Sequence, residues 1–292
     1  MEAPIVIPAH EHYVNRVLFT RDSGTLLSAG LDNVVKIWAV PSWQHIRTLR
    51  GHSKSVNAMV LSPDEKTLVT GSTDTTVRIW MFPEGELDRT LQGHRKTVSA
   101  VAMSPKGDLA ASASYDGTVR LWELASGQQP GAARGHKRNV TAVSFSPDGR
   151  TLLSAGLGGE ILLWALPTME AAGKLTGHAT AVGWLGFSPD DRYLLSTGYD
   201  QVLRLWSADD WRPVRSFDLK TKGTYAASFS ADSQVIAVAA EHAVLLFATK
   251  DGVLLPEVPL EPKGVYSVAF SPNGSWLACG AADKKIRIWK LD

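Results

Sequence analysis

Histidine, hydroxyl and aspartate residues recur along the chain at fixed spacing, as in His52, Thr70 and Asp74, and such a trio could support nucleophilic catalysis. In hydrolases of this kind the carboxylate orients the histidine, and the histidine takes the proton of the attacking hydroxyl. With a tryptophan six residues after the aspartate, the complete set occurs four times. The four sets are His10, Ser28, Asp32 and Trp38; His52, Thr70, Asp74 and Trp80; His94, Ser112, Asp116 and Trp122; and His178, Ser196, Asp200 and Trp206.

Repetition of the set favours a structural role over a catalytic one. An enzyme needs its nucleophile once, whereas this set takes the same place in four units of the chain. Other chemical motifs are missing, since the sequence has no Walker loop, no HExxH segment and only a single cysteine. We therefore predict a protein that is not an enzyme and that has no catalytic residue, cofactor site or metal site.

The spacing of the tryptophans reveals an internal repeat. Trp38, Trp80 and Trp122 follow each other at intervals of 42 residues, and the series continues with Trp164 and Trp206. The histidines of the sets keep the same interval. A fixed period of this length is typical of repeat architectures, and 292 residues accommodate seven such units. We expect residues 1–292 to form a single domain of seven repeats of about 42 residues.

Within each unit the apolar residues follow the period of strands. The fourth unit contains three short runs rich in Val, Ile, Leu and Thr, at 140–145, 151–154 and 161–164. The segment 146–149 reads Ser-Pro-Asp-Gly, a turn sequence, because proline presets φ and glycine accepts a positive φ. A fourth strand is expected between each tryptophan and the next histidine, as at 44–49. Such a sheet has two apolar faces, so neighbouring units must stack to bury them.

The repeated residues resemble the WD40 repeat. In the second unit the resemblance is carried by Gly51, His52, Ser62, Pro63, Asp64, Asp74, Arg78, Ile79 and Trp80. It extends over the whole chain and implies an all-β fold, a seven-bladed β-propeller of four-stranded antiparallel blades around a central channel. It also implies that each set forms a buried polar network. In such a network the aspartate orients the histidine, and the hydroxyl meets both the histidine and the indole N–H.

The two ends of the chain are expected to close the ring together. The last unit ends directly after its third strand, so it has no outer strand of its own. Residues 4–8, Pro-Ile-Val-Ile-Pro, stand where an outer strand would precede His10. We predict that they form the outer strand of the last blade, which leaves no open sheet edge at the junction.

Several units depart from the pattern. The fourth has Gly158 in the aspartate position, so we expect that corner of its blade to be less rigid. The sixth has no histidine, with Glu241 and Phe247 in the aspartate and tryptophan positions, and the seventh has Cys279 in the hydroxyl position. We expect these two blades to be held mainly by apolar packing, with Cys279 a buried apolar residue rather than a reactive thiol. In the fifth unit Trp184 replaces an alanine, and its ring must project into the channel or between blades.

Composition and charge narrow the classes of function. The 30 Lys and Arg residues balance 29 Asp and Glu residues, for a net charge of +1, which argues against nucleic acid as the partner. No apolar run is long enough to cross a membrane, and the N-terminus lacks the features of a signal peptide. A single cysteine cannot form an intramolecular disulfide, so we expect an intracellular, cytoplasmic protein.

In the WD40 family partners usually bind the face formed by the loops that enter the first strands and the loops between the second and third strands. On this face the resemblance places a cation two residues after the histidine position in five units. These cations are Lys54, Lys96, Arg138, Lys222 and Lys263. The same face is expected to carry Tyr115, Tyr199, Tyr225 and Tyr266. The cations favour an acidic or phosphorylated partner, and tyrosine is frequent at binding hot spots.

We therefore predict a non-catalytic scaffold that binds protein or peptide partners on this face within a multiprotein assembly, and that is monomeric as an isolated domain. Two alternatives come from other classes of protein. One is an enzyme with its site at the central channel, which would require carboxylates or histidines gathered there. The other is a nucleic-acid-binding propeller, which would be retained on nucleic acid in a salt-dependent way.

Overall fold

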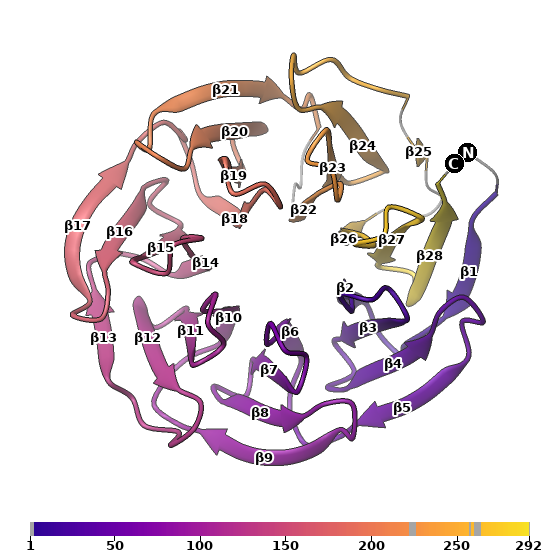
Figure 1. Ribbon diagram of the computed structural model, residues 1–292, viewed down its shortest axis with the longest axis horizontal. Helices are drawn as coiled ribbons and strands as arrows, with labels where there is room; N and C mark the ends of the chain where they lie inside the picture. The colour runs from indigo at the N-terminus through magenta and orange to yellow at the C-terminus, as the bar shows by residue number, and fades with distance from the viewer. Residues whose placement is uncertain (1–2, 222–225, 257, 260–263, 292) are drawn as a thin grey trace.

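The computed structural model describes residues 3–221, 226–256, 258–259 and 264–291, and these residues form seven four-stranded antiparallel sheets. The sheets stand around a central opening, each as one blade of a ring (Figure 1). The predicted seven-bladed β-propeller is therefore confirmed. Among the described residues there is no helix, and hence none long and apolar enough to cross a membrane.

The first four blades follow one another along the chain, each running from the centre of the ring to its rim. Blade 1 consists of β2 (Val14–Phe19), β3 (Thr25–Gly30), β4 (Val35–Ala39) and β5 (His45–Leu49). Blade 2 consists of β6 (Val56–Leu61), β7 (Thr67–Ser72), β8 (Val77–Met81) and β9 (Glu86–Leu91). Blade 3 consists of β10 (Val98–Met103), β11 (Leu109–Ser114), β12 (Thr118–Glu123) and β13 (Gly131–Arg134). Blade 4 consists of β14 (Val140–Phe145), β15 (Thr151–Gly156), β16 (Ile161–Ala165) and β17 (Glu170–Leu175).

The remaining blades complete the ring. Blade 5 consists of β18 (Val182–Phe187), β19 (Tyr193–Gly198), β20 (Val202–Ser207) and β21 (Pro213–Asp218). Blade 6 consists of β22 (Ala226–Phe229), β23 (Val235–Ala239), β24 (Ala243–Ala248) and the short β25 (Val258–Pro259). Blade 7 consists of β26 (Val265–Phe270), β27 (Trp276–Ala281) and β28 (Lys285–Lys290), with β1 (Ile5–Pro8) on its outer side.

The turn between β14 and β15 illustrates how the sequence sets the strand boundaries. Gly149 has a φ of 69°, a conformation that glycine adopts without steric cost, and its N–H donates to the carbonyl of Ser146 over 2.9 Å. The Ser146 hydroxyl donates to the Asp148 carboxylate over 2.6 Å. Each hydrogen bond closes the turn locally, so the first and second strands of the blade are brought into antiparallel contact.

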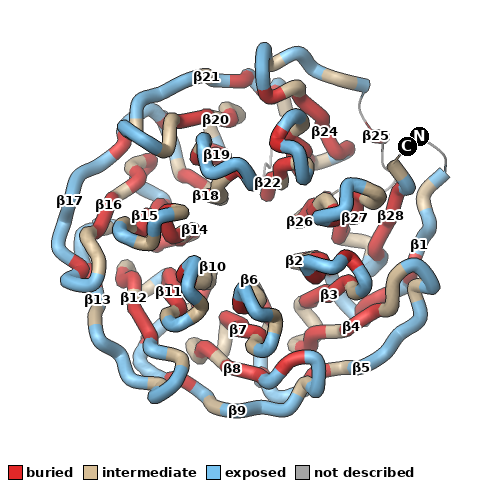
Figure 2. The backbone as a smooth tube through the Cα atoms, viewed as in Figure 1, coloured by how far each residue is buried: buried red, intermediate tan, exposed pale blue. Residues whose placement is uncertain are grey.

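The hydrophobic core lies between blades rather than within them. One cluster joins Ile79 and Leu91 of blade 2 to Val98 and Trp122 of blade 3, and equivalent clusters occur around the ring. Figure 2 shows the same layering, with buried residues concentrated in the inner three strands and exposed residues along outer strands such as β9 and β17. The blades thus supply each other's apolar contacts, as the repeat pattern predicts.

Strand β1 closes the ring by pairing with β28, far away in the sequence. Ile5 lies opposite Ile288 and Ile7 opposite Ile286. Ile7 is 8% exposed and packs into the core between blades 7 and 1, whereas its neighbour Val6 is 46% exposed. The predicted outer strand at residues 4–8 is confirmed, and it is seen in Figure 1 beside β28.

Blade 6 is the least regular part of the ring. Its outer strand β25 pairs with β24 only at Ala243 and Val244, and a separate bridge joins Phe247 to Leu254. Pro256 interrupts the strand between these contacts, because proline has no N–H to donate to the sheet. The outer strand of blade 6 is consequently shorter than the outer strands of blades 5 and 7.

Candidate functional site

The histidine, hydroxyl, aspartate and tryptophan residues of blade 2 form one connected hydrogen-bond network. His52 Nδ1 lies 2.8 Å from an oxygen of the Asp74 carboxylate, and His52 Nε2 lies 2.8 Å from Thr70 Oγ1. The indole N–H of Trp80 donates to the same Thr70 oxygen over 2.9 Å. Thr76 adds a hydroxyl hydrogen bond of 2.6 Å to the second Asp74 oxygen. The network joins the third strand to the loop that precedes the first.

Three other blades carry the same contacts at nearly the same distances. In blade 1 the His10–Asp32, His10–Ser28 and Trp38–Ser28 distances are 2.8, 2.8 and 2.9 Å. In blade 3 the His94–Asp116, His94–Ser112 and Trp122–Ser112 distances are 3.0, 2.7 and 2.8 Å. In blade 5 the His178–Asp200, His178–Ser196 and Trp206–Ser196 distances are 3.0, 2.8 and 3.0 Å.

The pKa values in these networks suit a structural role. Burial lowers the pKa of His52, although Asp74 acts in the opposite direction, so the imidazole favours its neutral form. Burial on its own would raise the pKa of Asp74, but hydrogen bonds from Thr76 and His52 outweigh it and bring the pKa to about 2. The Thr70 hydroxyl already has both His52 and Trp80 as partners and is fully buried, so it is not available for attack on a substrate.

Blades 4 and 7 keep only part of the network. In blade 4 His136 Nε2 lies 2.7 Å from Ser154 Oγ, but Gly158 provides no carboxylate for Nδ1. In blade 7 Asp283 forms an ion pair with Arg287, with nitrogen to oxygen distances of 2.7 and 3.0 Å. Besides apolar packing, blade 7 is thus held by an ion pair that the sequence alone did not reveal. Burial raises the pKa of the Cys279 thiol to about 12.

The two sets of loops that were expected to form one face are hydrogen-bonded to each other. The Tyr115 N–H donates to the carbonyl of Thr97 over 2.9 Å, and the Tyr199 N–H donates to the carbonyl of Ala181 over 2.8 Å. In blade 3 the Ser114 hydroxyl donates to the carbonyl of Lys96 over 3.2 Å. We call this side of the ring the loop face.

The predicted cations lie on the loop face where they are described. Lys54, Lys96 and Arg138 are exposed in the loops that lead into β6, β10 and β14. They are separate from one another, one to a blade. Lys222, Lys263 and Tyr225 lie outside the described residues.

Tyrosines surround the mouth of the channel on this face. Tyr115, Tyr199 and Tyr266 line one cavity of about 280 Å³. Tyr13, which was not among the predicted residues, stacks on Tyr266 with a distance of 5.6 Å between ring centroids and an angle of 20° between the rings. The structure therefore brings together three of the four predicted tyrosines and adds a further one.

Arg16 lies inside the channel and was missed as a functional candidate. It occupies the first-strand position that is alanine in blades 2 to 4, and it lines both the mouth and the narrower cavity of about 250 Å³ below. Its Nη1 donates to the carbonyls of Asn15 at 3.0 Å and Tyr266 at 3.5 Å. Among the described residues, no Asp or Glu oxygen lies within 4.0 Å of its guanidinium nitrogens. The exchange of alanine for arginine in one unit was the sequence signal that could have found it.

The guanidinium of Arg16 is a charge in a confined space, with no carboxylate partner in the part of the chain that the structure describes. Burial lowers the pKa of Arg16, while Tyr199 and Tyr115 act in the opposite direction. An arginine nevertheless remains protonated near neutral pH because its ordinary pKa is far above that range. The channel mouth thus combines one fixed positive charge with a rim of aromatic rings and hydroxyl groups.

Small polar side chains connect successive blades just inside the mouth. Asn15 Nδ2 donates to the carbonyl of Val56 over 3.1 Å, and Asn57 Nδ2 donates to the carbonyl of Val98 over 3.0 Å. Ser99 and Thr141 make the same kind of bond to the carbonyls of Val140 and Val182. In blade 5 the position is Gly183, which has no side chain to continue the series.

The ring of Trp184 was expected to project into the channel or between blades, and it does both. Its ring folds over Gly186, lines the channel cavity and packs against the clusters that join blades 5, 6 and 7. The Trp184 ring therefore forms part of the channel wall next to blade 6.

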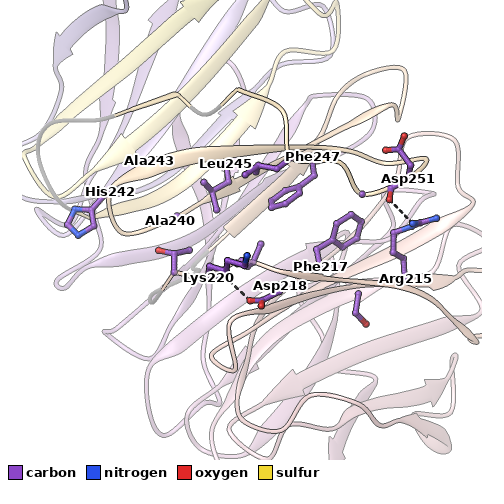
Figure 3. A pocket seen from close by; sticks show the side chains of 15 residues that line it. Arg215, Phe217, Asp218, Lys220, Ala240, His242, Ala243, Leu245, Phe247 and Asp251 are labelled. Carbon is purple, nitrogen blue, oxygen red and sulfur yellow. Dashed lines mark hydrogen bonds between the residues drawn. The ribbon is translucent and has the colours of Figure 1, made fainter.

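A third cavity, of about 530 Å³, lies between the outer strand of blade 5 and the third strand of blade 6. Figure 3 shows Phe217 and Phe247 facing one another along it, with His242 at one end and the Arg215–Asp251 contact at the other. Leu245 and Phe247 take the places of Arg204 and Trp206 of blade 5. Because both replacements are shorter, the groove between the blades is left open at the rim.

The fold and its four networks define a closed propeller built from seven related repeats. The chain matches the WD domain, G-beta repeat family, and it belongs to the WD40 family. The matched residues are 3–39, 43–81, 85–123, 127–165, 170–207 and 259–290, which leaves out most of irregular blade 6.

Similarity to curated proteins is confined to short stretches. An intraflagellar transport protein 122 homolog from Xenopus tropicalis is 33% identical over 76 residues, which are 26% of this chain and 6% of that protein. Its counterpart from Danio rerio is 38% identical over 65 residues, 22% of this chain and 6% of that protein. The Mus musculus counterpart is 37% identical over 65 residues, with the same coverage of 22% and 6%. The chain thus spans only a small fraction of these relatives.

Proposed function

We propose that this propeller is a non-catalytic scaffold that binds an acidic or phosphorylated segment of a protein partner at the channel mouth of the loop face. The observation that carries the proposal is Arg16, a protonated guanidinium within the channel with no carboxylate partner among the described residues. A buried or half-buried charge is costly unless an opposite charge approaches it. A carboxylate or phosphate group supplied by a partner meets that need with a charge-assisted hydrogen bond.

The rim of the mouth supports the same partner chemistry. Tyr115, Tyr199 and Tyr266 offer large contact areas with little rotamer entropy, and the exposed cations of blades 2 to 4 extend the positive charge outward. We include Tyr225, Lys222 and Lys263 in the proposed surface on sequence position alone. The cations steer an acidic segment toward the face, and Arg16 fixes one of its charges.

The proposed scaffold acts as one domain over residues 1–292, as a monomer in the cytoplasm. Absence of catalysis is supported by the saturated networks, in which each buried hydroxyl already has a histidine and an indole as partners. Among the described residues no group of three or more His, Cys, Asp or Glu side chains could hold a metal ion. The intraflagellar transport proteins match over too little of either chain to transfer their role.

A fluorescein-labelled hexaglutamate peptide tests the proposal by anisotropy, with a phosphoserine peptide as a second arm and hexalysine as the charge control. We expect Arg16→Ala to weaken acidic-peptide binding by about tenfold or more. The variant should fold, because alanine stands at this position in four other blades. Arg150→Ala, on the turn at the other end of the strands, is the matched control. Equal affinity of Arg16→Ala and the wild-type protein for both acidic peptides would refute the proposal.

A further inference from the structure

In blades 2, 3 and 5 the aspartate of the network is held by the histidine Nδ1 and two backbone N–H groups, and in blades 2 and 3 a threonine hydroxyl is a fourth donor. In blade 3 one Asp116 oxygen accepts the Arg95 N–H over 2.9 Å and lies 3.0 Å from His94 Nδ1. The other oxygen accepts the Thr118 N–H over 3.0 Å. Blade 2 repeats the arrangement, with 3.0 Å to the Ser53 N–H and 3.0 Å to the Thr76 N–H. The loop corner of a blade is therefore a preformed cradle for one carboxylate group.

Blade 4 has the imidazole and the two backbone N–H positions of this cradle but neither the carboxylate nor the threonine hydroxyl, because Gly158 and Glu160 stand in the places of Asp116 and Thr118. The corresponding donors are His136 Nδ1, the Lys137 N–H and the Glu160 N–H, and we call them the blade 4 corner. Within the described part of the chain, none of the three has a hydrogen-bond acceptor. Gly158 stands in the aspartate position, and a Cβ atom placed there would meet no heavy atom within 4 Å.

The rest of the blade 4 network places a proton on His136 Nδ1, which faces the open space beside Gly158. The Trp164 indole N–H donates to Ser154 Oγ over 2.8 Å, and Ser154 Oγ lies 2.7 Å from His136 Nε2. With the serine oxygen occupied as an acceptor, its hydroxyl donates to Nε2, and the neutral imidazole then carries its proton on Nδ1. Burial brings the pKa of His136 down to about 4, so the imidazole is neutral at physiological pH.

The charges around the corner favour an anion on balance. Lys137 and Arg138 are exposed beside it. The nearest acidic group is Glu160, whose carboxylate is engaged by Lys174 Nζ at 2.8 Å. No described residue of the chain supplies the acceptor that the three donors lack.

We propose that the blade 4 corner binds a carboxylate group supplied by another molecule, in the position that the Asp116 carboxylate holds in blade 3. A partner's acidic side chain or its terminal carboxylate offers the same chemistry. The site uses none of the residues of the channel mouth, so it adds a second point of recognition to the loop face and stands independently of Arg16.

Titration of the protein with short peptides, followed by NMR of the His136 ring and of the Lys137 and Glu160 amides, tests the site. The probes are Ac-Ala-Glu-Ala-NH2, its glutamine counterpart, and Ac-Ala-Ala-Ala with a free carboxyl terminus. We expect saturable shifts with one or both carboxylate peptides and none with the glutamine peptide, and the responding peptide identifies the source of the carboxylate. Equal responses to the glutamate and glutamine peptides, or no response at all, would overturn the proposal.

Gly158→Asp is the decisive variant, because it supplies the carboxylate from within the chain. We expect it to weaken peptide binding at this corner by about tenfold or more, and to raise the pKa of His136 as its new partner stabilises the imidazolium. Gly158→Ala is the matched control and should bind as the wild-type protein does. Undiminished binding by Gly158→Asp would contradict the site. Arg16→Ala should leave these shifts intact, so failure at the channel mouth and failure at the corner are distinguishable.

Discussion

Ile7 of β1 lies directly opposite Ile286 of β28, so the beginning and the end of the chain share one sheet. This pairing is what makes the ring continuous, and it buries Ile7 between blades 7 and 1.

Replacing Ile7 by alanine should therefore destabilise the whole propeller. We expect Ile7→Ala to lower the free energy of unfolding by about 2 to 4 kcal/mol, the usual cost of a cavity at a buried isoleucine. Urea denaturation followed by tryptophan fluorescence measures the change. Val6→Ala, which alters the exposed neighbour on the same strand, should change stability by about 0.5 kcal/mol or less. Similar effects of the two variants would mean that the strand contributes little to closure.

Removing the Asp74 carboxylate from the blade 2 network should lower the stability of the protein and affect no catalytic activity. Asp74→Ala leaves His52 and the Ser53 N–H without their acceptor, so we expect a loss of about 2 to 4 kcal/mol in the free energy of unfolding. The matched control is Asp88→Ala, which removes an exposed ion pair with Arg89 and should be nearly neutral. Esterase activity that disappears in Asp74→Ala while stability is kept would argue for the hydrolase interpretation.

Acid should destabilise the protein in two stages. Burial lowers the pKa values of His52, His94 and His178, and that of His136 to about 4, so the folded state resists a proton that the unfolded chain accepts near pH 6.5. Stability is thus fully present above about pH 6.5 and declines as the pH falls below it. The lowered pKa of Asp74, about 2, adds a second decline below about pH 4.

Denaturation at about pH 7.5 and about pH 5.5 measures the first stage, and we expect His136 alone to account for a difference of about 1 kcal/mol. In His136→Gln the difference between the two pH values should shrink by that amount. A free energy of unfolding that is the same at both pH values would show that the histidines do not control acid stability.

The single cysteine should be inert until the protein unfolds. Cys279 is completely buried, and burial raises its thiol pKa to about 12, so almost no thiolate is present at neutral pH. We expect an aromatic disulfide reagent to modify one thiol in urea and none in native buffer. Rapid labelling of the native protein would instead mean that blade 7 opens locally.

Prediction from sequence succeeded where one residue type recurs in one register. The repeated Trp38 and His10 positions determined the blades, and the Pro-Ile-Val-Ile-Pro segment was recognised because the last unit lacked a strand. A repeated pattern is strong evidence for the fold of each unit, because every unit must pack against its neighbours in the same way. The expectation for Tyr115 and Tyr199 followed from the same register, and both line the channel mouth.

Features that occur once were harder to find. Arg16 is a single exchange within a strand, and only the ring geometry places it in the channel beside Tyr266. The ion pair of Asp283 with Arg287 was hidden because the aspartate kept its place in the pattern while its partner changed. In both cases the role of the residue depends on which side chains surround it in the folded ring, and the period along the sequence does not specify these neighbours.

The polar links inside the channel join neighbouring blades in one repeated pattern. Asn15, Asn57, Ser99 and Thr141 each donate to a carbonyl of the next blade, so every neighbouring pair from blade 1 to blade 5 is joined by a side-chain hydrogen bond. The series ends at Gly183 in the innermost strand of blade 5, the blade whose outer strand borders the rim groove of Figure 3. Blades 1 to 5 therefore share a continuous series of side-chain bonds around the channel, whereas blade 5 is joined to blade 6 on its other side, by the Asp190 N–H that donates to Ser233 Oγ over 3.2 Å.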